Sequence, residues 1–332
     1  MVATRPTSAE DAAIPSSIAV SPAPDPSTVR IPGPWTHRDV SANGIRLHVA
    51  ELGSGPLVLL LHGFPEFWWA WRHQLTALRD AGYRAVAVDL RGYGDSDKPP
   101  RGYDGWTLAG DVAGLIKALG ERHAHLVGHA WGGLIGWTAA AMHPRLVRSF
   151  TAVAAPHPLA LRREVRRSAA RGAGSQARAF GAIFQAQLPL FPERALVAND
   201  AEAVEKLLRR LSGPLWTEQE SFAETVAMDR AAMLVPGVAH SALEYFRWAV
   251  RSQLRGDGRR FAEAMADPLT VPVLQTHGAL DPYLLESTAL ASWPWLGPRP
   301  VYQRFDQVGH FPHQEDPARF NEVLTGFLRN AG

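Results

Sequence analysis

Short apolar runs alternate with longer amphipathic stretches along much of the chain, and these two patterns predict strands and helices respectively. Asn43-Gly44 separates two β-like runs within residues 37–52, which predicts a hairpin. The later runs predict buried strands at 56–61 and 83–88, and further strands at 125–128, 149–154, 271–275 and 301–305. Helical patterns lie between or after them, at 69–78, 108–119, 133–142 and 316–328. This alternation predicts a doubly wound, mostly parallel sheet with right-handed crossovers.

The alternation stops after Pro156-His157-Pro158. Up to about residue 267 only helical patterns occur, at 161–171, 180–187, 201–211, 218–228 and 242–254. We therefore expect an α/β core formed by residues 33–156 and 267–332, with a helical cap inserted at 157–266. Residues 1–32 are rich in Ala, Pro, Ser and Thr without an apolar period, so they are expected to form a disordered leader.

The composition is that of a globular chain, with 46% hydrophobic and 20% charged residues among 332. Neither a membrane span nor a signal peptide is indicated, so a cytoplasmic location is the default expectation. A formal net charge of +2 gives no reason to expect nucleic acid as a partner. The absence of cysteine excludes disulfides and thiolate chemistry. No cofactor or metal is expected, and the oligomeric state stays open.

The stretch from Leu126 to Gly133 has the pattern of an apolar strand, a glycine-bracketed turn and a helix. This is the layout of a nucleophile elbow, in which small residues let the backbones approach closely. Gly128, Gly132 and Gly133 supply those small positions, and the central residue is Ala130. Because a methyl group cannot attack a substrate, covalent catalysis is not possible through residue 130.

Several candidate residues follow directly after predicted strands. Phe64 follows the first central strand, Ala130 and Trp131 the next, Asp281 a later one and His310 the last. Ligands of open parallel sheets bind beyond the carboxyl ends of the strands, so these residues are expected to converge. Their order of nucleophile position, acid and base is the order of a hydrolase triad.

Four motifs occur in sequence: His62-Gly63-Phe64-Pro65, the Asp89 to Ser96 loop, the Gly-His-x-Trp-Gly-Gly elbow, and Gly309-His310-Phe311-Pro312. With these motifs the chain from about Gly33 onward resembles the α/β-hydrolase superfamily, and within it the epoxide hydrolase and haloalkane dehalogenase branch. The resemblance implies that the backbone amides of Phe64 and Trp131 form an oxyanion hole. It also implies that His310 is the general base and that Asp281 orients it.

The chain departs from the epoxide hydrolase pattern at its reactive positions. In that family an Asp attacks the epoxide carbon, where this chain has Ala130, and two cap tyrosines donate hydrogen bonds to the ring oxygen. One tyrosine position falls on Phe246, one place after Tyr245, and the other falls near Phe180. Phenyl rings cannot donate these hydrogen bonds. The expected pocket residues are Trp68, Phe180, Phe184, Tyr245 and Phe246, with core packing as an equal alternative for Trp68.

These departures leave four functional interpretations open. The first is a diverged epoxide-hydrolase-like protein for a small or medium apolar substrate, weak or inactive because its covalent nucleophile is absent. The second is a serine esterase-like hydrolase in which a Ser at 130 has been changed to Ala. The third is a non-catalytic protein that binds a ligand under the cap. The fourth is hydrolysis by a water that His310 deprotonates.

Other polar residues near the motifs are expected to be structural. These residues are His62 and His129. The loop from Asp89 to Ser96 is expected to contribute to packing rather than to catalysis. Arginines on the first cap helix form one basic stripe, which is expected to be a solvated face, with an anionic partner or membrane surface as the alternative. The stripe consists of Arg162, Arg163, Arg166 and Arg167.

Overall fold

The computed structural model describes residues 24–170, 172 and 174–331. Within these residues, eight strands form one sheet in the order β1-β2-β4-β3-β5-β6-β7-β8. The strands are β1 (Thr36–Ala42), β2 (Ile45–Leu52), β3 (Leu57–Leu61), β4 (Arg84–Val88), β5 (Ala124–His129), β6 (Val147–Val153), β7 (Val273–Gly278) and β8 (Val301–Phe305). The pairs β1–β2 and β2–β4 are antiparallel and all other neighbours are parallel, which confirms the expected doubly wound, mostly parallel sheet.

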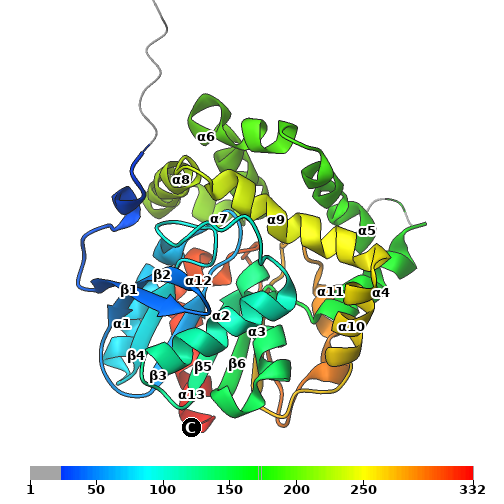
Figure 1. Ribbon diagram of the computed structural model, residues 1–332. Helices are drawn as coiled ribbons and strands as arrows, with labels where there is room; N and C mark the ends of the chain where they lie inside the picture. The colour runs from blue at the N-terminus through cyan, green and yellow to red at the C-terminus, as the bar shows by residue number, and fades with distance from the viewer. Residues whose placement is uncertain (1–23, 171, 173, 332) are drawn as a thin grey trace, which may run out of the picture.

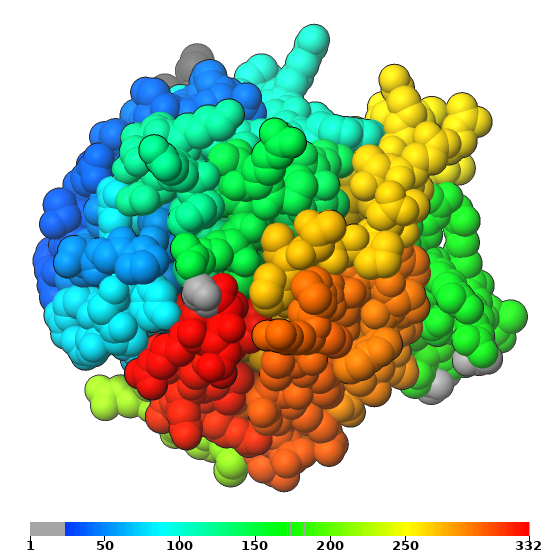
Figure 2. Space-filling view, turned by 90° about the horizontal axis from the view of Figure 1, so that it is seen from below, coloured from blue at the N-terminus to red at the C-terminus, as the bar shows by residue number. Residues whose placement is uncertain are grey.

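Helices cover both faces of the sheet. Every residue of β3, β5 and β7 is buried, and β3 is accordingly a continuous apolar run. The core helices are α1 (Arg72–Asp80), α2 (Gly105–Ala118), α3 (Ala130–Met142), α11 (Glu286–Leu290), α12 (Pro312–Glu315) and α13 (Pro317–Asn330). Helix α2 packs against α3, and α1 packs against α13. Figure 2 shows the red C-terminal helix beside the light-blue segment that contains α1, although these helices lie far apart in the sequence.

The hairpin β1–β2 turns at Asn43-Gly44, as the sequence predicts. Both residues have positive φ, 49° at Asn43 and 78° at Gly44, which is the conformation of a type I′ turn. Asn43 is one of the few side-chain-bearing residues that tolerate this conformation, because its short polar side chain can hydrogen-bond locally. Its amide also donates to Asp111 over 2.7 Å, which ties the turn to α2.

The cap contributes only helices to the described part of the chain, and Figure 1 shows them gathered on one side of the sheet. They are α4 (Pro158–Ser168), α5 (Gln176–Ala179), α6 (Phe191–Leu211), α7 (Pro214–Thr217), α8 (Glu220–Met233), α9 (Val238–Arg251) and α10 (Gly256–Ala264). Shorter 3₁₀ helices are η1 (Pro26–Val29), η2 (Trp68–Trp71), η3 (Pro144–Leu146), η4 (Gly181–Gln187), η5 (Ser252–Leu254) and η6 (Trp293–Trp295). None of the described helices combines the length and apolarity that a membrane crossing needs.

The cap differs from its sequence patterns in several places: α5, α7 and α10 were not predicted, and two predicted helices have a different form. The pattern at 180–187 predicts an α-helix, but η4 winds as a 3₁₀ helix there. Helix α6 begins ten residues before the predicted 201, and it is broken at 198–201, where three consecutive residues have positive φ. Arg230 on α8 donates to the carbonyl oxygen of Asp200 over 2.7 Å, so the break is held by a partner that is distant in sequence.

Residues 24–32 are ordered, which corrects the expected leader boundary at residue 32. Val29 is buried, and its carbonyl oxygen accepts a 2.8 Å hydrogen bond from the indole of Trp68. Arg30 donates to Asp95 over 2.6 Å. A tertiary ion pair and an indole thus order a stretch whose composition shows no apolar period. The rest of the expected leader, residues 1–23, lies outside the described residues.

Gly278, the last residue of β7, lies against the loop that carries the base candidate. A Cβ there would collide with the carbonyl oxygens of Gly309 and Val308. We predict that Gly278→Ala lowers the free energy of unfolding by roughly 1–3 kcal/mol, because backbone must shift to admit the methyl group. Urea denaturation measures this. The matched control is Gly326→Ala on α13, where the new methyl meets open space and should stabilise the helix by about 1 kcal/mol. Equal effects of the two substitutions would contradict the proposed close approach.

Candidate active site

The turn between β5 and α3 has the geometry of a nucleophile elbow. Ala130 lies at its centre with φ 45°, a left-handed conformation that residues with a side chain rarely adopt. The amide of Gly132 donates to the carbonyl oxygen of His62 over 3.1 Å, and a Cβ at Gly132 would collide with the carbonyl oxygens of Leu61 and His62. Helix α3 starts at Ala130, three residues before its sequence pattern begins, because the residues of the turn form the first turn of the helix.

Asp281 and His310 form a buried hydrogen-bonded pair on the loops after β7 and β8. The Nδ1 atom of His310 lies 2.7 Å from Oδ2 of Asp281, as the sequence leads us to expect. The other carboxylate oxygen accepts from the amides of Tyr283 and Leu284 over 2.8 and 3.0 Å. Burial raises the pKa of Asp281, but the charge and hydrogen bond of His310 outweigh it, and the net pKa is lowered. The carboxylate is therefore ionised at neutral pH and its oxygens are occupied.

The side chain of His310 is 2% exposed and keeps one nitrogen free. Burial lowers its pKa, but the charge and hydrogen bond of Asp281, with the charges of Glu66 and Glu315, overcome this effect and raise the pKa above 6.5. The Nε2 atom makes no hydrogen bond to any described residue. The ring lies 4.8 Å from that of His129, the residue directly before Ala130. A base with its acceptor nitrogen open and its other nitrogen held by a carboxylate is the arrangement that proton transfer requires.

Two backbone amides beside the elbow are also free. Among the described residues, the amides of Phe64 and Trp131 have no hydrogen-bond acceptor, whereas the neighbouring amides of Gly63 and Gly132 do. Phe64, Ala130 and Trp131 each retain partial exposure under the cap. Fixed amide donors of this kind stabilise negative charge on an oxygen.

The cap places aromatic rings over these groups. The ring of Phe246 on α9 lies 5.2 Å from that of Phe64 and 4.9 Å from that of Trp131. Phe180 stacks on Tyr283 at 5.1 Å, and Tyr283 packs its edge on His310 at 5.6 Å. Phe180 and Phe246, both expected in the pocket, therefore lie near the base and the free amides.

Tyr245 lies beside Trp131, with 5.8 Å between the rings, but its hydroxyl points elsewhere. That hydroxyl donates to the carbonyl oxygen of Arg91 over 2.7 Å, and the side chain is fully buried. One helical position separates Tyr245 from Phe246, so the two side chains point in different directions around α9. The expectation that Tyr245 contributes to the substrate pocket is therefore corrected: its only donor is already used by the core.

Two other expected pocket residues are also corrected. Phe184 is 61% exposed, because it lies on the outer side of η4. Trp68 is fully buried and packs at 5.2 Å against Trp35 and at 5.1 Å against His37. Its indole is held by Val29, so the alternative of core packing is the correct one for Trp68.

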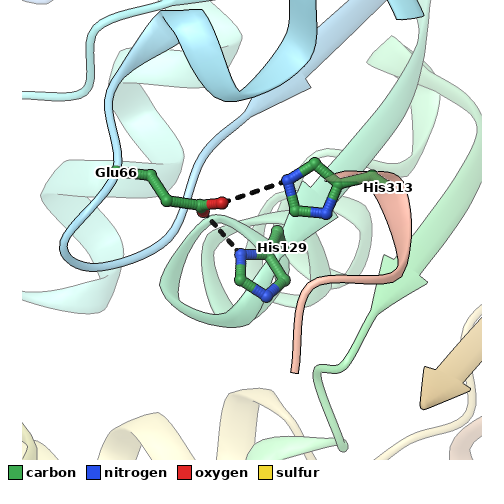
Figure 3. Close-up of side chains that lie close together, drawn as sticks. All are labelled: Glu66, His129 and His313. Atoms are coloured by element: carbon green, nitrogen blue, oxygen red, sulfur yellow. Dashed lines mark hydrogen bonds and ion pairs between the residues drawn. The ribbon is translucent and has the colours of Figure 1, made fainter. Parts of the chain in front are cut away.

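Glu66 is a buried hydrogen-bonding centre that the sequence analysis missed. Figure 3 shows its carboxylate between His129 and His313. Its oxygens accept from the amide of Gly63 at 2.8 Å and the side chains of His129 at 2.6 Å, His313 at 3.1 Å and Gln314 at 2.7 Å. Burial raises the pKa of Glu66, but the two histidines reverse this, and the net pKa lies well below its usual value. The one feature of the sequence that could have indicated this role is the position of Glu66 directly after the motif His62-Gly63-Phe64-Pro65.

His129 links this carboxylate to the base loop. Its Nδ1 faces Glu66 and its Nε2 lies 2.9 Å from the carbonyl oxygen of His310. The two ring nitrogens of His129 therefore tie the carboxylate of Glu66 to the backbone of the base loop. Glu66, His129 and His313 present ligand-type atoms within 4.8 Å of one another, a grouping that can bind a metal. Hydrogen bonds already occupy both Glu66 oxygens and both His129 nitrogens, so we interpret the group as a structural hydrogen-bond network.

The other residues expected to be structural have matching contacts. His62 hydrogen-bonds the carbonyl oxygen of Gly63 at 2.8 Å and accepts from the amide of Leu90 at 3.1 Å. Asp89 is fully buried and lies 2.7 Å from His48, while accepting from the amide of Trp68 at 3.0 Å. Both residues hold loops in place beneath the site.

Tyr283 was also missed. Its hydroxyl has no hydrogen-bond partner among the described residues, although its ring lies between Phe180 and His310. Its position two residues after Asp281 is the only feature of the sequence that could have indicated that Tyr283 lies near the site.

The basic stripe on α4 lines a surface groove of about 600 Å³ with Leu159. Within the described residues, Arg167 has an ion pair with Glu164 at 3.8 Å. The solvated face and the anionic partner both stay predictions.

Comparisons with known proteins assign the fold. Residues 56–317 match the family described as alpha/beta hydrolase fold. The chain is 33% identical over 297 residues to the AB hydrolase superfamily protein YfhM of Bacillus subtilis (strain 168), covering 88% of this chain and 97% of that protein. It is 32% identical over 294 residues to Epoxide hydrolase 3 of Xenopus tropicalis, covering 86% and 76% of the two chains. The crystal structure of an epoxide hydrolase from an endophytic Streptomyces superposes with a TM-score of 0.75 and 28% identity, covering 90% and 96%.

The chain therefore belongs to the α/β-hydrolase fold family. Within that family it is epoxide-hydrolase-like, as the four motifs imply.

The first prediction concerns the pKa of His310. NMR titration should place it above 6.5 in the unchanged chain and below 6.5 in Asp281→Asn, because burial dominates once the carboxylate charge is lost. Between pH 6.5 and the raised pKa the folded state holds a proton that the unfolded state lacks. The free energy of unfolding contributed by His310 is thus present below pH 6.5 and lost as the pH rises through the folded pKa. An unchanged titration in Asp281→Asn would contradict the assigned cause.

The second prediction concerns Glu66. We expect Glu66→Gln to lower the free energy of unfolding by roughly 3–5 kcal/mol, because it removes the buried charged acceptor that four hydrogen-bond donors share. Chemical denaturation measures the effect. Glu263→Gln is the control, because Glu263 is exposed and has no side-chain partner among the described residues. The unfolding midpoint of this control variant should equal that of the unchanged chain. A Glu66→Gln variant as stable as the control would show that Glu66 is not an essential charged acceptor.

Proposed function

We propose that this chain is an epoxide-hydrolase-like α/β-hydrolase that accepts a small or medium apolar molecule under its cap, and whose covalent route is closed at residue 130. The observation that carries this proposal is Ala130 itself. It occupies the strained centre of the elbow at φ 45°, where the nucleophile of such an enzyme stands, and its side chain is a methyl group. Turnover of epoxides by the unchanged chain is accordingly very low.

The remaining groups support a hydrolase geometry rather than another chemistry. Asp281 and His310 are paired at 2.7 Å, and the amides of Phe64 and Trp131 are without acceptors. Removing a triad nucleophile leaves the contributions of oxyanion binding and substrate binding, which are worth roughly 10³ to 10⁴ over water in serine proteases. A slow hydrolysis by water, with His310 as base, is the second candidate, and the free Nε2 of His310 favours it.

The cap supports weak epoxide opening even with a nucleophile present. The alkoxide that leaves an opened epoxide needs a hydrogen-bond donor, and Phe246 and Phe180 have none. Tyr245 donates to the carbonyl of Arg91. An ester places its negative charge on an oxygen that the two free amides can stabilise, so it does not need a cap donor.

The test compares Ala130→Asp and Ala130→Ser on a simple aryl epoxide and an activated aryl ester. We expect Ala130→Ser to raise ester hydrolysis on the order of 100-fold over the unchanged chain. Ala130→Asp should raise epoxide hydrolysis much less, because neither Phe180 nor Phe246 can donate a hydrogen bond to the leaving alkoxide. Initial rates and detection of the acyl intermediate by mass spectrometry are the measurements.

The double variant Ala130→Ser with His310→Gln is the control, and it should lose the gain. Fast epoxide turnover by the unchanged chain would overturn the proposal. Fast turnover by Ala130→Asp would show that another donor acts on the ring oxygen, for which the free hydroxyl of Tyr283, whose ring lies 5.6 Å from that of His310, is a candidate.

A further inference from the structure

The elbow holds hydrogen-bond donors without an acceptor of their own. The amides of Phe64 and Trp131 are free among the described residues, and the 13-residue helix α3 begins at Ala130, so the positive end of its dipole lies at this point. An Asp at position 130 would bring a carboxylate to these donors. Ala130 brings none, so the donors must take their acceptor from elsewhere.

His310 provides independent evidence for an anionic ligand. Its side chain is 2% exposed, its Nδ1 is held by Asp281, and its Nε2 has no partner among the described residues. Its ring lies 4.8 Å from that of His129, one residue from Ala130. His129 also bonds the carbonyl oxygen of His310 at 2.9 Å, so the loop that carries this free nitrogen is joined to the elbow that carries the amide of Trp131.

The carboxylates nearest to these donors are both occupied. Asp281 accepts from His310 and from two backbone amides. Glu66 accepts from Gly63 and from three side chains. Neither can supply the missing acceptor without breaking bonds that hold the loops together.

The walls of the site are apolar. Phe64, Trp131 and Phe246 form one group of rings, with centroids 4.9 and 5.2 Å from Phe246, and Phe180 stacks on Tyr283 at 5.1 Å. Such rings contribute apolar area and favour edge-to-face contacts with an aromatic group. The ligand that fits this site has a charged end and an apolar body.

We propose that the protein binds a carboxylic acid with an apolar or aromatic body, with one carboxylate oxygen on the amides of Phe64 and Trp131 and the other on Nε2 of His310. This inference rests on the proposed function, because it requires the covalent route at residue 130 to be closed. A carboxylate suits this set once a proton is on Nε2 of His310, which the acid itself supplies on binding, since two amides and one imidazolium N–H match a planar monoanion. Phosphate dianions are usually bound by Arg or Lys. The binding is non-covalent.

The experiment measures binding of phenylacetate and of its neutral analogue phenylacetamide by calorimetry and by ¹⁵N NMR. The acid should bind the unchanged chain at least about tenfold more tightly than the amide, because charge-assisted hydrogen bonds are stronger than neutral ones. It should also shift the amide signals of Phe64 and Trp131 and the Nε2 signal of His310. Equal affinity for acid and amide, or shifts confined to other residues, would overturn the proposal.

Two variants separate charge from shape. Ala130→Asp places the protein's own carboxylate on the same donors, so it should weaken phenylacetate about tenfold more than it weakens phenylacetamide. A purely steric effect would weaken both compounds equally and would overturn the proposal. His310→Gln should weaken the acid while its NMR spectrum remains that of a folded chain, and unchanged affinity for the acid would equally overturn it.

Failure of this inference is distinct from failure of the proposed function. Phenylacetate and phenylacetamide are assayed by binding alone, and turnover is measured separately with epoxide and ester. Rapid epoxide turnover by the unchanged chain would overturn the proposed function. Absence of selective acid binding in a chain without turnover would overturn only the carboxylate inference.

Discussion

The buried carboxylate of Glu66 holds together the three chain segments that build the candidate site. It accepts hydrogen bonds from the loop after β3 through Gly63, from the elbow through His129, and from the loop after β8 through His313 and Gln314. Taking a carboxylate out of water costs several kcal/mol, and close donors and an opposite charge are needed to offset this. The offset is complete only when all three loops are in their native positions, so this one charge makes their arrangement cooperative.

The base is positioned from two sides, and neither depends on residue 130. The backbone of His310 is fixed by His129, which donates to its carbonyl oxygen, and the ring is fixed by Asp281. Asp281 in turn is followed by a loop that the cap holds, since Gln176 on α5 bonds the carbonyl oxygen of Tyr283 and the amide of Leu285. Contacts from both the cap and the core therefore orient Asp281 and His310. None of these contacts involves the side chain of residue 130, so the pair keeps its geometry although that residue is Ala.

The sequence predicted those features that local patterns determine. The strand predicted at 301–305 has the observed bounds of β8, and Asn43-Gly44 gave the correct hairpin. The break in α6 was not predictable, because the partner that holds it, Arg230, is thirty residues away in the chain. Glu66 was missed for the same reason: its four donors come from three separate segments. The prediction that Phe184 lines the pocket was wrong. The sequence of a short helix does not show which of its faces packs against the rest of the protein, so the exposure of Phe184 could not be predicted.

Ala130 keeps the left-handed backbone of the elbow although it has no reactive group. A residue with a side chain held in a sparsely populated conformation costs of order 1–3 kcal/mol, which the surrounding structure must over-determine. Here the packing of Gly132 against the end of β3 and the hydrogen bond to His62 do so. Shape and reactivity at this position are thus separable properties. For protein engineering, the elbow is a backbone conformation that is already in place. Side chains of different chemistry can be introduced at position 130 without redesigning that backbone.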